Sequence, residues 1–301
     1  MKLMEPFTIQ HLVIVGVGLI GGSVGLALKR AGAVGRVTGV GRSRENLMTA
    51  EARGIVDDWT HDLKAAVADA DVVLLAVPMA AYDALLREMA DALPADAVVT
   101  DAGSTKQSAI AAAQRWLPDA RRFVAAHPIA GTEQSGAAAA FAELFDDHLA
   151  IVTPDSVSDP AAVARVEALW QAVGSRVIRM AADEHDRLLA AVSHLPHLAA
   201  FALVNAVRKQ ADAARDPFDF AAGGFRDFTR IASSSPEMWR DIALCNREAL
   251  AAQIDAMQAE LAGMKTALLT GDGAQLFEDF SAAKAARDAW LARRDKQGDQ
   301  P

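Results

Sequence analysis

The stretch His11–Leu28 reads HLVIVGVGLIGGSVGLAL, and it decides the fold of the chain. Its first part, Leu12–Val15, is a run of branched apolar residues that predicts a strand buried on both faces. The run breaks at Gly16, and an apolar pattern with helical spacing resumes after Gly22. The stretch therefore predicts a buried strand, a glycine-rich turn and a helix in immediate succession.

The turn is a G-x-G-x-x-G motif formed by Gly16, Gly18 and Gly21. Gly16 permits the tight turn, Gly18 lets the backbone approach a pyrophosphate, and Gly21 lets helix and strand pack closely. The helix N-terminus offers free N–H groups and a partial positive charge to the phosphates. Because both flanks fit, we predict a dinucleotide-binding turn, with Leu19 and Ile20 among the contacts.

The composition limits the classes of partner. With 301 residues the chain is long enough for two domains, and its 52% hydrophobic content favours a large core over disorder. Its formal net charge of −9 argues against binding to nucleic acid or to an anionic membrane. An anionic ligand therefore needs a local cationic pocket.

The sequence also favours a reducing compartment. Cys245 is the single cysteine, which excludes a disulfide within the chain. The apolar run near the N-terminus is short, broken by glycine and preceded by Glu5, so it is unlike a signal peptide. No apolar stretch reaches the roughly 20 uninterrupted residues of a membrane span, and even Leu188–Val207 contains two histidines and a proline. We expect a cytoplasmic protein.

A second strand is predicted at Arg36–Val40, followed by a loop where the adenosine ribose is bound. NAD-specific proteins usually place a carboxylate here to accept a hydrogen bond from the ribose 2′-OH. This loop has none and carries Arg42, Ser43 and Arg44 instead. Guanidinium groups pair bidentately with a 2′-phosphate, so the loop favours NADP over NAD. Ordinary solvated surface arginines are the alternative interpretation.

Strands and helices alternate up to about residue 181. Further strands are predicted at 72–77, 97–100, 123–126, 149–153 and 177–180, with helices at 45–53, 82–92 and 159–172. This alternation predicts an α/β fold with a doubly wound parallel sheet, whose ligands bind at the carboxyl ends of strands. Val77 and Pro78 end one strand and are therefore expected to contact the cofactor.

The pattern changes after this point. From Asp183 to Arg294 it is almost entirely helical and rich in alanine, without convincing strands. We therefore predict a dinucleotide-binding domain over residues 1–181 and an all-α domain over residues 182–301.

Two polar segments follow neighbouring strands. His127 opens HPIAGTEQSG, and an imidazole with an ordinary pKa of about 6.5 suits the role of base for a hydroxyl undergoing oxidation. Ser104, in DAGSTK, could orient that ring or the substrate hydroxyl. A His-Pro turn and a helix N-cap are the respective structural alternatives.

Two further segments, SHLPH at 193–197 and GGFRDFTRIA at 223–232, complete a series. In their order and spacing, from Leu12 to about Arg294, the segments resemble the prephenate/arogenate (cyclohexadienyl) dehydrogenase family of tyrosine biosynthesis. The resemblance implies a Rossmann-type domain followed by a helical domain that forms a homodimer. It also implies oxidative decarboxylation, in which hydride leaves C4 of a cyclohexadienol for the nicotinamide and the ring carboxylate departs as carbon dioxide.

By this resemblance His127 is the base, Ser104 hydrogen-bonds the same region, and Arg230 clamps a substrate carboxylate. The remaining implied substrate contacts are Thr132, Glu133, His194 and His197. Arginine is the best bidentate partner for a carboxylate, although a salt bridge to Asp227 is the alternative for Arg230. We predict no metal site, because the two histidines of SHLPH lack a third ligand with suitable spacing.

Some alternatives remain open at this point. Asp146 and Asp147 slightly favour arogenate over prephenate, although two ordinary surface aspartates are the more common explanation, so both substrates are kept. His185 is expected to be structural or on the surface, and Trp239 to belong to a core. A 3-hydroxyacid-type dehydrogenase would need a lysine in the helix Asp183–Val207, which has none. An NADP-binding sensor protein would not need the base, the serine and the arginine together.

Overall fold

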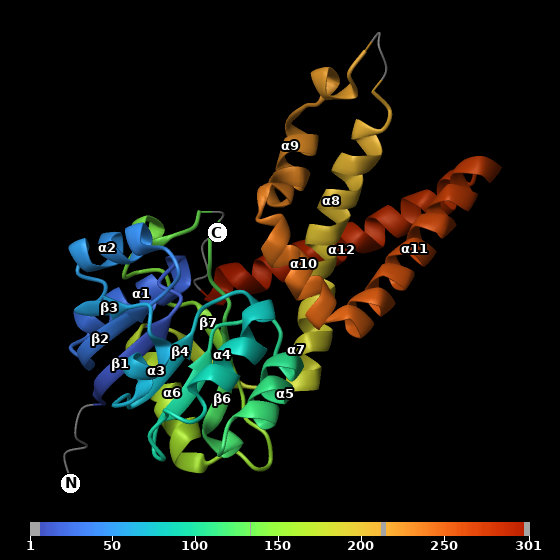
Figure 1. The fold of residues 1–301 in the computed structure, drawn as a ribbon. Helices are drawn as coiled ribbons and strands as arrows, with labels where there is room; N and C mark the ends of the chain where they lie inside the picture. Colours follow the sequence, from blue (N-terminus) through green and yellow to red (C-terminus); the bar gives the residue numbers. More distant parts are fainter. Residues whose placement is uncertain (1–6, 133, 212–214, 298–301) are drawn as a thin grey trace. The chain divides into compact units, whose positions relative to one another are not determined.

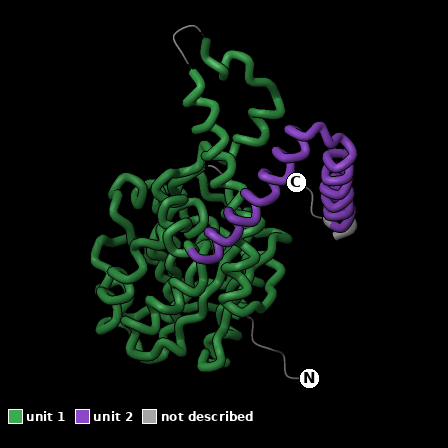
Figure 2. Tube along the Cα trace, turned by 90° about the vertical axis from the view of Figure 1, so that its right-hand side faces the viewer, with its two compact units in different colours: residues 1–247 green, residues 248–301 purple. Residues whose placement is uncertain are grey.

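The computed structural model describes residues 7–132, 134–211 and 215–297. The chain divides into two compact units, residues 1–247 and residues 248–301 (Figure 2). The first unit contains a single sheet with helices on both of its faces, followed by further helices (Figure 1). The second unit consists of two long helices, described at the end of this section.

Eight strands form the sheet in the order β3-β2-β1-β4-β5-β6-β7-β8. They are β1 (Ile9–Val15), β2 (Val34–Val40), β3 (Asp58–Thr60), β4 (Val72–Leu75), β5 (Val98–Asp101), β6 (Phe123–Pro128), β7 (Leu149–Thr153) and β8 (Arg176–Arg179). Neighbouring strands from β3 to β6 are parallel, which confirms the predicted doubly wound α/β fold.

The last two strands run in the opposite direction. β7 pairs antiparallel with β6, and β8 pairs parallel with β7. A parallel neighbour needs a crossover connection, which is usually an α-helix. The connection between β6 and β7 contains no α-helix among its described residues, only the short 3₁₀ turn Ala137–Ala139, so the chain returns antiparallel.

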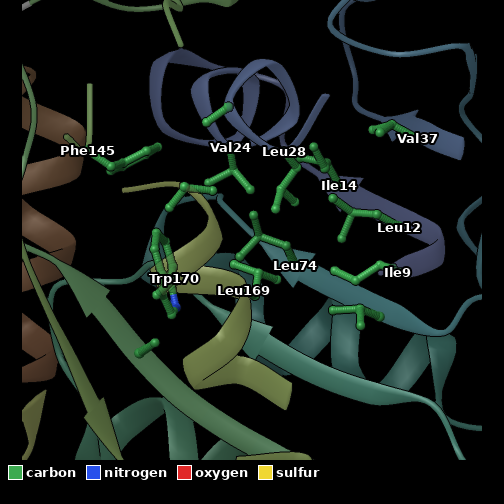
Figure 3. Close-up of a cluster of buried hydrophobic side chains, with 14 of the residues drawn as sticks. Ile9, Leu12, Ile14, Val24, Leu28, Val37, Leu74, Phe145, Leu169 and Trp170 are labelled. Carbon is green, nitrogen blue, oxygen red and sulfur yellow. The ribbon is translucent and has the colours of Figure 1, made fainter. Parts of the chain in front are cut away.

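Helices cover both faces of the sheet. They are α1 (Leu19–Arg30), α2 (Arg44–Ala52), α3 (Leu63–Val67), α4 (Tyr82–Met89), α5 (Gln107–Trp116) and α6 (Pro160–Ala172). The core on one face joins α1 and α6 to Leu12 and Ile14 of β1, together with Trp170 (Figure 3). The core on the other face joins α3, α4 and α5 to Val13 and Val15. Successive residues of β1 thus enter different cores, which is why the strand reads as one continuous apolar run.

The first unit continues with helices after β8. They are α7 (Ala182–Leu189), a π-helical turn (Ala190–His194), α8 (Leu195–Arg208), α9 (Gly223–Thr229) and α10 (Pro236–Cys245). α7 contacts α5, and α10 contacts the 3₁₀ turn Met79–Ala81 that follows β4. These contacts place α7 to α10 in the same unit as the sheet. The predicted domain boundary at residue 181 is a different division, and it stays a prediction.

One helical run, Ala182–Arg208, is long and apolar enough to cross a membrane by length and composition alone among the described residues. An 18-residue window within it has a mean hydropathy of 1.5, although the run contains two histidines and a proline near its middle. The run also carries His185 and Asp186, both buried in a network of hydrogen bonds. That network is part of the candidate site.

The second unit holds α11 (Arg247–Thr270) and α12 (Gly273–Gln297). Gly271, with a left-handed φ of 71°, lies between them. Among the described residues after β8 there is no strand, as predicted. Several large apolar side chains of this unit are exposed, namely Leu261, Leu268, Leu269, Phe277, Phe280 and Trp290.

Candidate functional site

The glycine turn connects β1 to α1 as predicted. Gly16 has a left-handed φ of 96°, and a Cβ there would lie 2.4 Å from the carbonyl oxygen of Ala76, so only glycine fits. A Cβ on Gly21 would lie 2.4 Å from the carbonyl oxygen of Gly16, so this glycine allows α1 to lie close to the turn. At Gly18 a Cβ would meet no atom within 4 Å.

These features fit a pyrophosphate. α1 begins at Leu19 without a side-chain cap, which leaves the N–H groups of its first turn available to an anion. Leu19 is buried and Ile20 partly buried. Val77, which contacts the turn at Gly16, is partly buried, and Pro78 is exposed. The open space beside Gly18 is where the backbone can approach phosphates.

The predicted ribose loop follows β2 at the same edge of the sheet. The Ser43 hydroxyl accepts a hydrogen bond from the Asn46 N–H at 3.2 Å and so caps α2. The side chains of Arg42 and Arg44 are exposed, and in the described part of the chain no ion pair involves their guanidinium groups. Asn46, which no sequence motif marks, donates to the carbonyl of Val17 at 2.7 Å and thereby connects α2 to the glycine turn.

A buried ion pair fixes the ends of β5 and β6. The Lys106 ammonium donates to Asp101 at 2.5 Å and to the carbonyl of Ala126 at 2.6 Å, and neither Lys106 nor Asp101 is exposed. Asp101 also accepts from the Tyr82 hydroxyl at 3.0 Å and from the Ala126 N–H at 2.9 Å. The residue after Ala126 is His127, so this network sets the position of the predicted base.

His127 lies at the carboxyl end of β6, partly buried, against His185 of α7. Its Nδ1 is 2.9 Å from Nε2 of His185, and the two rings meet edge to face. Desolvation, followed by the neighbouring His185 and Lys106, lowers the pKa of His127 well below its ordinary value. The ring is therefore neutral at neutral pH, the form that can accept a proton.

Asp186 connects this pair to the start of α5. Its carboxylate accepts from Nδ1 of His185 at 2.8 Å and from the backbone N–H groups of Lys106 and Gln107 at 2.7 and 3.0 Å. Desolvation raises the pKa of Asp186, but these hydrogen bonds outweigh it and hold the pKa below its ordinary value. The sequence offered no motif around His185 and Asp186, so both were missed.

Asn246 connects His194 to the same aspartate, Asp186. The Asn246 amide donates to the carbonyl of Asp186 at 2.7 Å and to Nδ1 of His194 at 3.1 Å. Because Nδ1 accepts, Nε2 carries the proton, and this buried atom has no hydrogen-bond partner within the described residues. Burial lowers the pKa of His194 to about 4, and the charge of Asp186 and a backbone contact with Ser104 only partly oppose that change.

The position of His194 follows from Pro196. Proline has no N–H to donate and its ring crowds the preceding turn, so a regular helix cannot run through it. The chain instead forms the π-helical turn at Ala190–His194 and restarts as α8 with Pro196 in its first turn. Turns of this kind are frequent at functional sites.

His197 and Trp239 pack together beside His194. Their rings stack with centroids 3.6 Å apart, and Nδ1 of His197 donates to the carbonyl of Ser193 at 2.9 Å. Trp239 is buried as expected, but it also supports His194 edge-on at 6.0 Å. Burial lowers the pKa of His197, and Arg230 contributes in the same direction, which places the arginine's charge near this ring.

The structure thus brings together most of the predicted substrate-side residues through this chain of contacts: Ser104, His127, His194, His197 and Arg230. Arg230 itself is exposed directly after α9, and Asp227, the alternative partner predicted for it, pairs with Arg226 at 3.1 Å. Thr132 is exposed, with its hydroxyl accepting from the Gln134 N–H at 3.2 Å. Glu133 lies outside the described residues. No group of three potential ligands that could hold a metal ion occurs in the described ranges.

Asp146 takes no part in this cluster. Its carboxylate pairs with Arg30, in the last turn of α1, at 2.5 Å. The glycine turn lies at the opposite end of that helix. The surface interpretation of Asp146 therefore holds, and this residue gives no support to a preference for arogenate.

Comparison with known proteins is consistent with this geometry. Two family models match, the prephenate dehydrogenase nucleotide-binding domain over residues 24–179 and the prephenate dehydrogenase dimerization domain over residues 181–282. A cyclohexadienyl dehydrogenase of Zymomonas mobilis is 40% identical over 279 residues, which cover 92% of this chain and 95% of that protein.

Two solved structures are also similar. The prephenate dehydrogenase from A. aeolicus, in complex with hydroxyphenyl propionate and NAD⁺, superimposes with a TM-score of 0.90 at 34% identity, covering 95% of this chain and 99% of that chain. The Synechocystis arogenate dehydrogenase gives a TM-score of 0.78 at 27% identity, covering 93% of this chain and 100% of that chain.

Proposed function

The chain belongs to the prephenate dehydrogenase family, and on that premise we propose that it converts prephenate or arogenate by oxidative decarboxylation in tyrosine biosynthesis. The observation that carries the proposal is the neutral His127 at the carboxyl end of β6. It lies at the same edge of the parallel sheet as the glycine turn, where ligands of such sheets bind.

The bound nicotinamide dinucleotide supplies the hydride acceptor. Nε2 of His127 takes the proton of the substrate's C4 hydroxyl, so that the C4–O bond can become a carbonyl as hydride departs. The bond to the ring carboxylate then breaks, its electron pair enters the ring, and carbon dioxide leaves as the ring becomes aromatic. Ser104 follows β5, and its backbone lies beside His194; the proposed role of its side chain is to orient the substrate hydroxyl.

Substrate binding requires cations or N–H donors, because the substrate carries two carboxylates and the chain has a formal net charge of −9. Arg230 supplies a guanidinium near His197 and would clamp one carboxylate. The buried N–H at Nε2 of His194 supplies a directed donor. His197, held flat on Trp239, lines the same side. Thr132 and Glu133 remain predicted contacts.

We also propose that NADP is preferred over NAD. Arg42 and Arg44 are exposed after β2, and no carboxylate occupies the loop to bind a ribose 2′-OH. The similar A. aeolicus enzyme was solved with NAD⁺, so the preference rests on this loop alone.

The remaining proposals concern organisation. Residues 1–181 would bind the dinucleotide, and residues 182–301 would complete the substrate site and form a cytoplasmic homodimer. The match to a dimerization domain over residues 181–282 supports the homodimer.

The experiment that tests the function measures initial rates of nicotinamide reduction with prephenate and with arogenate, each with NADP⁺ and NAD⁺. We expect turnover with at least one substrate and faster rates with NADP⁺. If all four pairs are silent with folded protein, the proposed activity is wrong, and an NADP-binding sensor becomes the better explanation.

A further inference from the structure

We infer that His185 and Asp186 are positioning residues that hold His127 in the one tautomer able to act as a base, an inference that rests on the proposed role of His127. A neutral imidazole carries its proton on one nitrogen only, and the other nitrogen accepts. A base must present its unprotonated nitrogen to the substrate. The hydrogen bonds behind His127 determine which nitrogen that is.

The assignment starts at Asp186. Its pKa is lowered, so it is a carboxylate, and a carboxylate only accepts hydrogen bonds. A His185 ring that carries one proton must therefore carry it on Nδ1, which is 2.8 Å from that carboxylate, and Nε2 of this ring then has a lone pair. This lone pair faces Nδ1 of His127 at 2.9 Å. Nδ1 of His127 must then donate, which leaves Nε2 of His127 unprotonated.

The opposite arrangement is disfavoured by the same geometry. If His185 donated from Nε2 to His127, its bare Nδ1 would lie 2.8 Å from an oxygen of the Asp186 carboxylate. Two acceptors at that distance repel each other, and both groups are buried, so water cannot relieve the repulsion. Rotating the carboxylate does not help, because its two oxygens also accept the backbone N–H groups of Lys106 and Gln107.

The positions of these groups are fixed by a closed ring of contacts. The Lys106 backbone N–H holds Asp186, while its ammonium holds the carbonyl of Ala126, the residue before His127. His127 contacts His185, which contacts Asp186 in turn. One lysine therefore fixes both ends of the histidine pair. Such over-determination is what keeps a catalytic ring in a single orientation.

In the reaction only one proton moves at this site. The C4 hydroxyl proton passes to Nε2 of His127, while the proton on Nδ1 stays and continues to bond His185. The positive charge that develops on His127 is then stabilised through His185 by the carboxylate of Asp186. The charged and titratable groups around His127 are His185 and Asp186 of α7, Lys106 at the start of α5, and His194.

The direct test is the tautomer of His127 in the full chain. Protein labelled with ¹⁵N-histidine is examined by long-range ¹H–¹⁵N NMR at about pH 8, with the His127 signals assigned by their loss in His127→Asn. We expect a proton on Nδ1 and none on Nε2. A proton on Nε2 of neutral His127, or protons on both nitrogens of His185, would overturn the inference. This result does not depend on any activity.

A pair of variants tests the consequence for turnover. In His185→Gln the amide can donate to Asp186 and accept from His127, whereas in His185→Leu the side chain can do neither. We expect the leucine variant to lose about 10–100-fold in kcat, the range found when the partner that orients a metal-bound histidine is removed. We expect the glutamine variant to retain most of the rate.

Controls separate positioning from folding and from the proposed function. Glu184→Gln, an exposed change on α7, should leave the rate unchanged, and thermal melting checks that every variant is folded. Equal losses in folded leucine and glutamine variants would contradict the tautomer role. A wild-type protein that shows the expected tautomer but no turnover with any substrate would overturn the proposed function and leave the inference standing.

Discussion

Individual residues at the end of β6 owe their chemistry to burial. A buried histidine loses the water that would stabilise its charged form, so its pKa falls. The pKa values of His127 and His194 are both lowered in this way. Lys106 and Asp101 form a fully buried ion pair nearby. The site therefore holds neutral rings next to a fixed buried charge, which suits proton transfer from a hydroxyl near neutral pH.

The depressed pKa of His194 makes stability depend on pH. The ring titrates near pH 4 in the folded chain and near its ordinary 6.5 when unfolded, so the unfolded chain binds more protons between these values. The free energy of unfolding should be highest above pH 6.5 and should fall as the pH drops towards 4, by up to about 3 kcal/mol from this group.

Denaturant unfolding at pH 7 and pH 4.5 measures that dependence. His194→Gln should depend less on pH than the wild type, while His148→Gln, an exposed change, should not differ from it. Identical pH slopes for the wild type and His194→Gln would show that His194 does not titrate as described.

Arg42 and Arg44 carry the prediction on cofactor choice. Replacing both with alanine removes the charge-assisted hydrogen bonds to a 2′-phosphate, each worth about 1.5–3 kcal/mol. Two such bonds together amount to about 3–6 kcal/mol, so we expect the affinity for NADP to fall by about 100-fold or more, while the affinity for NAD changes little. Fluorescence titration with both dinucleotides measures the two constants. Equal changes for both would mean that the loop does not bind the 2′-phosphate.

At the scale of elements, two glycines of the turn between β1 and α1 have different roles. One is required for folding, and the other leaves space for the cofactor. Gly16 is required by its left-handed φ and its contact with Ala76, whereas Gly18 borders open space. Gly18→Ala should therefore melt close to the wild-type temperature. Its methyl group would occupy the space proposed for the pyrophosphate and weaken cofactor binding by about 10-fold or more.

Gly16→Ala is the matched variant. It places a Cβ against backbone in a conformation that L-residues avoid, so it should lower the melting temperature or prevent folding. Calorimetry and cofactor titration on both variants check the contrast. A folded Gly18→Ala protein with undiminished cofactor affinity would move the pyrophosphate away from this turn.

Sequence patterns predicted the strands that are buried between the two hydrophobic cores. Strands such as β1 and β4 are covered on both faces, so their residues form apolar runs that are visible without a structure. The three-residue β3 at the sheet edge and the short α3 have no such run. The reversal of β7 was also missed, because it follows from a connection whose described residues contain no α-helix, rather than from the residues of the strand itself.

The site was predictable only where residues lie together in a motif. Gly16, Gly18 and Gly21 are neighbours in sequence, and SHLPH carries both of its histidines in five residues. His127 and His185, in contrast, are 58 residues apart and meet only through the packing of α7 beside α5. Asn246 reaches His194 over 52 residues. No local pattern marks such pairs.

At the scale of the whole molecule, exposed apolar side chains of the second unit support the proposed homodimer. Leu269 of α11 and Phe277 of α12 are 78% and 73% exposed, and an interface with a second copy would bury these large apolar side chains. We expect the double variant Leu269→Glu/Phe277→Glu to sediment as a monomer, or to dissociate at lower concentration than the wild type. Analytical ultracentrifugation measures this.

Val157→Glu is the control for that experiment. Val157 is an exposed apolar residue of the first unit, outside the region that matches the dimerization domain. Its substitution should leave the sedimentation of the wild type unchanged. A wild-type protein that is monomeric at all concentrations would contradict the homodimer.

We propose that the substrate hydroxyl is oxidised beside His127 and the groups that hold it. The most direct test is kcat for His127→Asn with the substrate and cofactor that the wild type prefers, alongside its cofactor affinity. We predict a loss of about 10²–10⁴-fold in kcat, the usual share of a general base, with cofactor affinity nearly unchanged. A folded variant that turns over at the wild-type rate would remove His127 from the mechanism and contradict the account.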